Sequence, residues 1–143
     1  MTIAEIRSNI RYNENLIEQY SNEKRGLETQ ISELEALSSK FSGLQSRFGD
    51  RQQQRQNKLS FFLSSCLQNQ ILKRYYNGMN GLLGGSDFNN AYDGLSEAKR
   101  KISQKINQLD DQLDDCKERI AYRRRRRDYW KSQLATAMAE GGA

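Results

Sequence analysis

Apolar side chains recur every three or four residues along two long stretches of a chain that contains no proline. In the first stretch, from Thr2 to about Phe48, this spacing is typical of an amphipathic helix of the coiled-coil type. The second stretch begins at Phe88 and repeats the pattern. A single such helix would leave its apolar seam in water, so we predict that the two helices pack together. The first seam consists of Ile3, Ile6, Ile10, Ile17, Tyr20, Leu27, Ile31, Leu34, Phe41 and Phe48, interrupted by Asn13, Lys24, Ser38 and Gln45. The second consists of Phe88, Tyr92, Leu95, Ile102, Ile106, Leu109, Leu113, Cys116, Ile120, Trp130, Leu134 and Ala137.

The segment 49–58, GDRQQQRQNK, has no apolar side chain. One interpretation is a solvated part of a continuous helix, because glutamine and arginine favour helices. The other is a break at Gly49-Asp50, which would give three helices. We expect the continuous helix, running over residues 2–76.

Four glycines lie within residues 77–87, where we predict the turn of the hairpin. Ser86 and Asp87 are N-cap candidates for a second helix over residues 88–138, followed by a frayed tail. The sequence thus predicts an all-α fold: one elongated, antiparallel helical hairpin formed by residues 1–143.

Charge suggests a register for the hairpin. Reflecting the chain about positions 82–83 places Arg51 and Arg55 opposite the acidic run 110–115. In this register Cys66 and Cys116 would be about 25 Å apart, so both are predicted to be free thiols. The first 25 or so residues would have no intramolecular partner. Their seam is therefore predicted to bind another chain, through Ile3, Ile6, Ile10, Ile17 and Tyr20.

The positive charge of the chain is local. Lysine and arginine total 23 and acidic residues 18, so without the arginine run 123–127 the remainder is neutral. Arg123 and Arg127 fall in seam positions. Three interpretations remain: a solvated turn near the helix end, a docking site for an acidic protein, or a nucleic-acid site with stacking aromatics nearby. The neutral remainder makes nucleic acid the weakest of the three. The candidate partner-binding residues here are Arg123, Arg124, Arg125, Arg126 and Arg127.

A second candidate partner contact is the pair Phe61-Phe62. Adjacent helical residues point 100° apart, so one of the two is predicted to be a surface anchor for a partner.

No catalytic constellation is present. The chain has no histidine, no phosphate-binding loop and no paired-cysteine motif, so we predict a non-enzymatic protein without cofactor or metal. The N-terminal sequence Thr2-Ile3-Ala4-Glu5 forms a helix-capping box and does not resemble a signal peptide. The most apolar window, residues 59–67, is too short to span a bilayer. We therefore expect a cytoplasmic chain that does not insert into membranes.

The segment Tyr75-Tyr76-Asn77-Gly78, followed ten residues later by Phe88 and a long heptad helix, resembles the WXG100-like small helical proteins of Gram-positive type VII secretion. The resemblance is greatest to the longer YwqH-like subgroup encoded beside LXG-domain toxins. It implies that Tyr76 occupies the motif's tryptophan position, that Gly78 is the motif glycine, and that Phe88 opens the return helix. The motif aromatic here is tyrosine, and the glycine-rich loop is longer than in the family.

The resemblance also implies a function: a helical adaptor or targeting chaperone that binds the helical N-terminal region of an LXG toxin in a hetero-oligomer. The family's export signal, an aromatic followed four positions later by an acid, does not occur around Tyr122 or Tyr129. The resemblance therefore implies a cytoplasmic targeting partner, or export together with a second small helical protein that bears the signal. The alternatives are a coiled-coil stalk or tether of another secretion machine and an arginine-rich nucleic-acid-binding helix.

Overall fold

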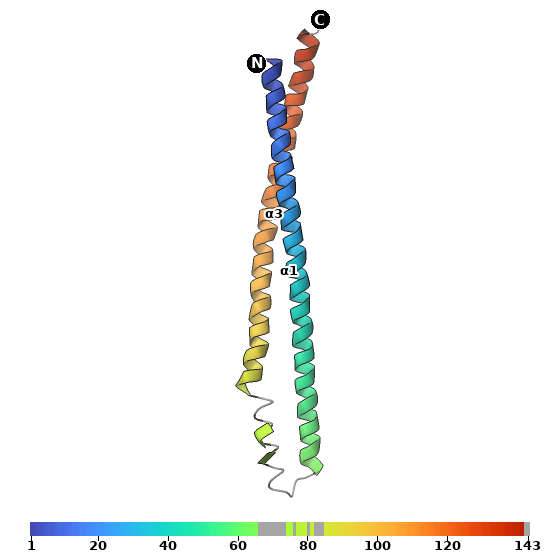
Figure 1. Ribbon diagram of the computed structural model, residues 1–143, viewed down its shortest axis with the longest axis vertical. Helices are drawn as coiled ribbons and strands as arrows, with labels where there is room; N and C mark the ends of the chain where they lie inside the picture. The colour runs from blue at the N-terminus through green and yellow to red at the C-terminus, as the bar shows by residue number, and fades with distance from the viewer. Residues whose placement is uncertain (66–73, 76, 80, 82–84, 142–143) are drawn as a thin grey trace. The chain divides into compact units, whose positions relative to one another are not determined.

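The computed structural model describes residues 1–65, 74–75, 77–79, 81 and 85–141, except for the side chains of residues 62–65 and 86. Its two long helices are α1, Ile3–Ser65, and α3, Ser86–Gly141 (Figure 1). No β-strand occurs among the described residues. Contacts between α1 and α3 pair the two helices in antiparallel directions, so the predicted all-α helical hairpin is confirmed.

Helix α1 continues without a break through residues 49–58. The apolar side chains stop there, but the buried side of the helix does not: Gln45 and Leu59 are buried, and Gly49, Gln52 and Gln56 between them are half-buried at the same 3-4 spacing. Glutamine maintains the helix because it has a high helix propensity and a long side chain that can cover the neighbouring helix. The continuous interpretation is confirmed, and the break at Gly49 is excluded.

The predicted capping box forms at the start of α1. The Glu5 backbone N–H donates to Thr2 Oγ1 at 3.1 Å, and the Thr2 backbone N–H donates to Glu5 Oε2 at 2.7 Å. The Ile6 N–H donates to the Thr2 carbonyl at 3.1 Å. These bonds satisfy N–H groups that have no partner inside the helix.

The chain divides into two compact units. Unit 1 combines residues 1–33 with residues 106–143, and unit 2 consists of residues 34–105. Each is an antiparallel pair of helical segments that buries apolar side chains from both. Burying one such side chain contributes about 1.5–3 kcal/mol. The buried apolar side chains of unit 1 are Ile6, Ile10, Leu27, Ile31, Leu109, Cys116 and Ile120. Those described in unit 2 are Leu59 and Ile102.

The register of unit 1 differs from the predicted one. The Cys116 thiol donates to the Tyr20 carbonyl at 3.0 Å, and Arg123 Nη1 donates to Asn13 Oδ1 at 3.5 Å. The first 25 residues therefore do have an intramolecular partner, and the prediction of an unpaired N-terminal seam is wrong.

Of the five seam residues assigned to partner binding, Ile6 and Ile10 are buried inside unit 1, with exposed fractions of 4% and 9%. Ile3, Ile17 and Tyr20 are half-buried. The N-terminal seam was predicted to bind another chain, but in the structure the C-terminal part of α3 covers it.

The register of unit 2 is set by other pairs. Phe48 stacks on Phe88 with ring centroids 4.7 Å apart, and Gln45 hydrogen-bonds to Tyr92 and Ser96. Arg51, one turn beyond Phe48, therefore lies near the start of α3 and not opposite the aspartates of residues 110–115. Exposed charge pairs contribute only about 0–1 kcal/mol each, too little to outweigh buried apolar and polar contacts.

The stretch predicted as the turn is described only in part. Residues 77–79 and 81 are helical, Gly85 is a bend, and α3 begins at Ser86. None of the described glycines has a positive φ. Tyr76 and Cys66 lie outside the described residues, so their predicted roles are not addressed by the structure.

Candidate partner-binding surfaces

The arginine run 123–127 lies in the middle of a regular part of α3 and is not a loosened turn. Arg123, in a seam position, is half-buried, donates to the buried Asn13, and has its guanidinium carbon 5.6 Å from the Tyr12 ring centroid and 5.1 Å from that of Tyr122. A charge in a seam is tolerated when hydrogen bonds and aromatic faces replace water. The polar interruption at Asn13 in one helix thus matches the polar interruption at Arg123 in the other.

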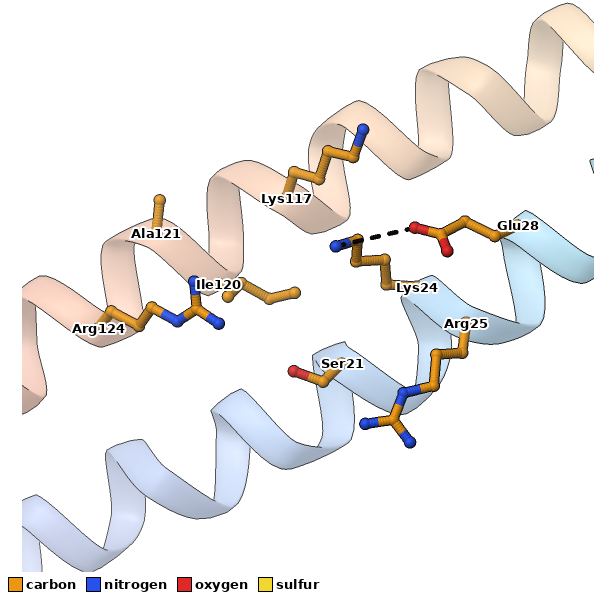
Figure 2. Close-up of a pocket in the computed structure, with 8 residues that line it drawn as sticks. All are labelled: Ser21, Lys24, Arg25, Glu28, Lys117, Ile120, Ala121 and Arg124. Atoms are coloured by element: carbon orange, nitrogen blue, oxygen red, sulfur yellow. Dashed lines mark ion pairs between the residues drawn. The ribbon is translucent and has the colours of Figure 1, made fainter.

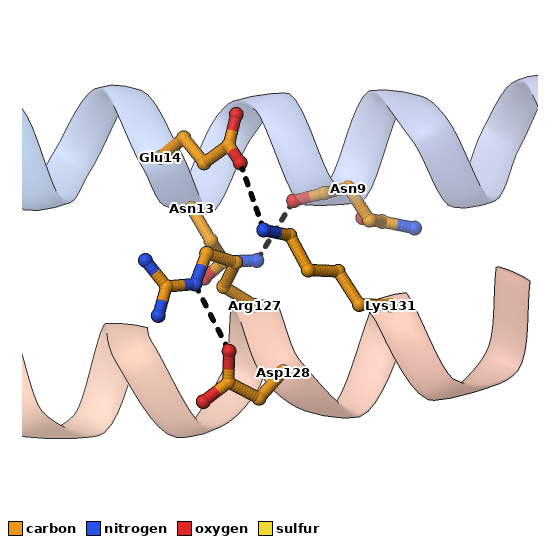
Figure 3. Close-up of polar contacts among 6 residues, drawn as sticks. All are labelled: Asn9, Asn13, Glu14, Arg127, Asp128 and Lys131. Atoms are coloured by element: carbon orange, nitrogen blue, oxygen red, sulfur yellow. Dashed lines mark hydrogen bonds and ion pairs between the residues drawn. The ribbon is translucent and has the colours of Figure 1, made fainter. Parts of the chain in front are cut away.

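Neighbouring polar residues complete this layer of unit 1 (Figure 3). Asn13 Nδ2 donates to the Asn9 carbonyl at 2.8 Å, and Arg127 Nε donates to Asp128 Oδ1 at 3.0 Å. Lys131 forms an ion pair with Glu14 across the two helices at 3.6 Å. Arg126 is held by stacking, with its guanidinium 5.1 Å from Tyr129 and 5.5 Å from Trp130.

Arg124 points into a groove between α1 and α3 with a volume of about 450 Å³. In Figure 2, Ser21 and Lys24 of α1 and Arg124 of α3 point into the space between the helices, near the buried Ile120. We call this the Arg124 groove. It is lined by Ser21, Lys24, Arg25, Glu28, Lys117, Ile120, Ala121 and Arg124.

A second groove, of about 310 Å³, lies on the other side of the same seam and has a different charge pattern. Its cations are already engaged: Arg119 pairs with Asp115 at 3.1 Å and has its guanidinium 5.8 Å from the Tyr20 ring, while Arg123 binds Asn13. We call this the Arg119 groove. It is lined by Tyr20, Asp115, Glu118, Arg119, Tyr122 and Arg123.

Unit 2 exposes large apolar side chains on one face of α1. Leu37 is 39% exposed, Leu44 is 46% exposed, and Phe48 keeps part of its surface exposed although its ring stacks on Phe88. At 100° per residue, positions 37, 44 and 48 lie within about 40° of one another around the helix. We call these three residues the unit 2 stripe. Arg47 and Arg51 lie beside it and line a shallow groove of about 330 Å³ with Leu44 and Phe48.

The remaining predicted residues are not gathered into one site. Phe61 is an exposed side chain near the end of α1, whereas the side chain of Phe62 is outside the described part. Gly78 is helical and exposed, and Phe88 is the half-buried partner of Phe48. Arg125, like Arg124, is exposed.

Sequence reasoning missed the unit 2 stripe because Leu37 and Leu44 are outside the predicted seam. The available signal was their seven-residue spacing, which places them on one face beside that seam. The Arg124 groove was missed because the wrong register did not bring residues 21–28 next to residues 117–124.

Cys116 is a free thiol in the core of unit 1. Burial raises its pKa, and the nearby carboxylate of Glu23 adds to the effect. A neutral, buried thiol reacts slowly, and Cys116 contributes to the packing of unit 1.

Among the described residues, no group of three or more histidine, cysteine or acidic side chains could hold a metal ion. None of the helices described is long and apolar enough to cross a membrane. Comparison of the chain with protein-family models, with curated proteins and with solved structures finds no match.

Proposed function

We propose that this protein is a non-enzymatic helical adaptor that packs against a helix of another protein. Its partner, in this proposal, is the helical N-terminal region of an LXG toxin, which the adaptor accompanies to a type VII secretion machine. The observation that supports a helical partner is the unit 2 stripe. The resemblance of the turn segment to WXG100-like proteins supports the choice of partner.

The stripe suits a third helix because of its geometry. Leu37, Leu44 and Phe48 follow the 3-4 spacing with which one helix meets another, so a partner helix can lie along them. Covering these partly exposed side chains would contribute about 2–4 kcal/mol to binding. That is enough to orient a partner and too little for a stable complex by itself, so further contacts along the helices are part of the proposal.

The flanking charges define the partner further. Arg47 and Arg51 border the stripe, and no ion pair among the described residues involves either of them. A partner helix with acidic residues beside its apolar stripe would meet these cations. Such pairs affect the choice of partner and the association rate more than they raise affinity.

Co-expression with the N-terminal region of an LXG toxin, followed by size-exclusion chromatography, tests the proposal. The two chains are expected to elute together. The double variant Leu37→Gln/Leu44→Gln should weaken this association about tenfold or more, because it makes the stripe polar while keeping good helix formers.

Met138→Gln is the matched control, since Met138 is a 49% exposed apolar side chain of α3 in unit 1. It should leave co-elution unchanged. Separate elution of the wild-type chains would overturn the toxin assignment. Equal effects of the double variant and of Met138→Gln would overturn the stripe as the binding surface.

A further inference from the structure

The residues that line the Arg124 groove carry more positive than negative charge. Four cationic side chains and one acidic side chain line it. Lys24 pairs with Glu28 at 3.7 Å. Among the described residues, the side chains of Arg25, Lys117 and Arg124 have no ion pair or hydrogen bond.

The Arg119 groove provides an internal comparison on the same two helical segments. Two cationic and two acidic side chains line it, and both cations are engaged by a carboxylate, an amide or aromatic rings. Among the described residues that line the two grooves, the cations without an ion-pair or hydrogen-bond partner therefore lie on one side of the seam.

We propose that the Arg124 groove is a docking site for an acidic amphipathic helix of a partner protein. This inference concerns a surface in the other unit from the stripe, and it holds whether or not the partner is a secreted toxin.

The dimensions of the groove favour a helix as the occupant. Lys117 and Arg124 are seven residues apart, or about 10.5 Å along α3, which equals two turns of a helix lying beside them. A helix with glutamates at positions i, i+4 and i+7 places carboxylates on one face at this spacing. Ala121 and the largely buried Ile120 add a small apolar surface to the lining of the groove, beside these cations.

The same features disfavour a nucleic acid. Outside the arginine run, 18 basic residues are balanced by 18 acidic ones, so no extended basic face follows the groove. Binding of phosphate backbones depends on such a face. A carboxylate pair on a short helix needs only the local cluster.

Direct binding of a synthetic peptide to the full chain tests the proposal. The probe is a fluorescent, amphipathic helical peptide of about 20 residues with glutamates at i, i+4 and i+7. The control peptide carries glutamines at those positions. By fluorescence anisotropy, the glutamate peptide should bind about tenfold more tightly, and the difference should shrink between about 0.05 M and about 0.5 M NaCl.

Variants assign the binding to the groove. Arg124→Gln should weaken binding of the glutamate peptide about threefold, and Arg25→Gln/Lys117→Gln/Arg124→Gln about tenfold or more. Glu28→Gln should strengthen binding about twofold, because it removes the one acid of the groove and releases Lys24. Arg119→Gln is the matched control and should change the affinity less than twofold.

Three results would overturn the proposal: equal affinities for the two peptides, equal losses for Arg119→Gln and Arg124→Gln, or tighter binding of poly(U) RNA than of the peptide with the same variants affected. None of these measurements uses the toxin or the unit 2 stripe. Failure here would therefore leave the proposed function intact, and failure of co-elution would leave this groove intact.

Discussion

The two units use the same pair of helices in different ways. In unit 1 the described core contains seven buried apolar side chains, and the 12 basic residues of this unit are nearly balanced by 13 acidic ones. In unit 2 the described core contains Leu59 and Ile102, while Leu37, Leu44 and Phe48 remain partly exposed. Unit 1 therefore covers most of its own apolar seam, whereas unit 2 leaves Leu37, Leu44 and Phe48 partly exposed beside Arg47 and Arg51. A partner of the unit 2 stripe would therefore meet apolar surface and cations together, whereas a partner of the Arg124 groove would meet mainly cations.

Polar seam residues also differ between the units. Buried Asn13 of unit 1 has one long contact across the helices, to Arg123 at 3.5 Å. Buried Gln45 of unit 2 has three: its Nε2 donates to the Tyr92 carbonyl at 3.0 Å and to Ser96 Oγ at 2.6 Å, and Lys99 Nζ donates to its Oε1 at 3.1 Å. Unit 2 thus relies more on hydrogen bonds, and unit 1 more on apolar burial.

The largest expected effect concerns access to the core of unit 1. In a Cys66→Ser background, alkylation of Cys116 should be on the order of a thousandfold slower in buffer than in denaturant. The thiol is buried, donates to the Tyr20 carbonyl, and has a pKa raised mainly by burial. Folding favours the neutral form of the Cys116 thiol. The contribution of this thiol to the free energy of unfolding is therefore complete below the ordinary thiol pKa and is lost as the pH rises through the raised pKa. Mass spectrometry measures the extent of alkylation. Rapid alkylation of Cys116 in the native chain would show that the helices of unit 1 do not bury this side chain.

The next largest effect is the difference in stability loss between a core residue of unit 1 and a residue of the unit 2 stripe. Leu109→Ala should lower the free energy of unfolding by about 3 kcal/mol, because Leu109 is only 2% exposed and its removal leaves a cavity. Leu44→Ala should cost less than about 1 kcal/mol, because much of Leu44 is already in water. Urea denaturation followed by circular dichroism measures both values. Similar losses would contradict the assignment of Leu44 to a surface stripe.

A smaller effect distinguishes the two polar seam residues. Gln45→Ala should destabilise the chain by about 2 kcal/mol, because it removes three cross-helix hydrogen bonds. Asn13→Ala should cost about 1 kcal/mol, since its one cross-helix bond is long. Denaturation midpoints compared at equal slope provide the test. The reverse order would mean that Arg123 depends on Asn13 more than the geometry indicates.

The smallest effect is at the start of α1. Thr2→Ala should cost about 0.5–1 kcal/mol and increase amide exchange in the first turn, because Thr2 Oγ1 accepts the Glu5 N–H. The hydrogen bond from the Thr2 backbone N–H lowers the pKa of Glu5. The stabilisation from this hydrogen bond is present above the ordinary carboxyl pKa and is lost as the pH falls through the lowered pKa of Glu5. Protection of the first-turn amides against exchange in the wild-type chain should therefore decrease in acid.

Thr136→Ala is the control for this last variant. Thr136 Oγ1 donates to the Ser132 carbonyl within α3, an exposed bond that caps no helix end. Amide exchange measured by NMR in the first turn of α1 should not respond to it. A response equal to that of Thr2→Ala would argue against a capping role for Thr2.

Much of the fold follows from local sequence signals. Helix type, the capping box at Thr2 and the helical continuity through Gly49 depend on nearby residues, and all three were predicted correctly. The register was not, because it depends on which residues far apart in sequence meet. Exposed Arg–Asp pairs were chosen as the guide, although their energies are small.

A better guide was present in the sequence. The seams of both helices contain polar interruptions, and in the structure those of α1 at Asn13 and Gln45 face polar groups of α3. A buried amide must find hydrogen-bond partners, so matching the interruptions selects a register more strongly than surface charge does. The Arg124 groove depends on the register, so it could not be located without it, whereas the unit 2 stripe lies on α1 alone and had a signal in the spacing of Leu37 and Leu44.

The matched amides have a consequence for how the hairpin reaches its final alignment. Apolar residues that repeat every seven positions pack against the facing helix almost equally well after one helix shifts by a heptad. Apolar contacts alone therefore allow several registers of similar energy. In unit 2, such a slide would separate Gln45 from the Tyr92 carbonyl, Ser96 and Lys99 together. A hairpin that first collapses in a shifted register would leave the Gln45 amide without hydrogen-bond partners. The cost of that buried, unpaired amide favours realignment to the native register. Gln45 interrupts the apolar seam, and its hydrogen bonds to α3 select one alignment of the two helices in unit 2.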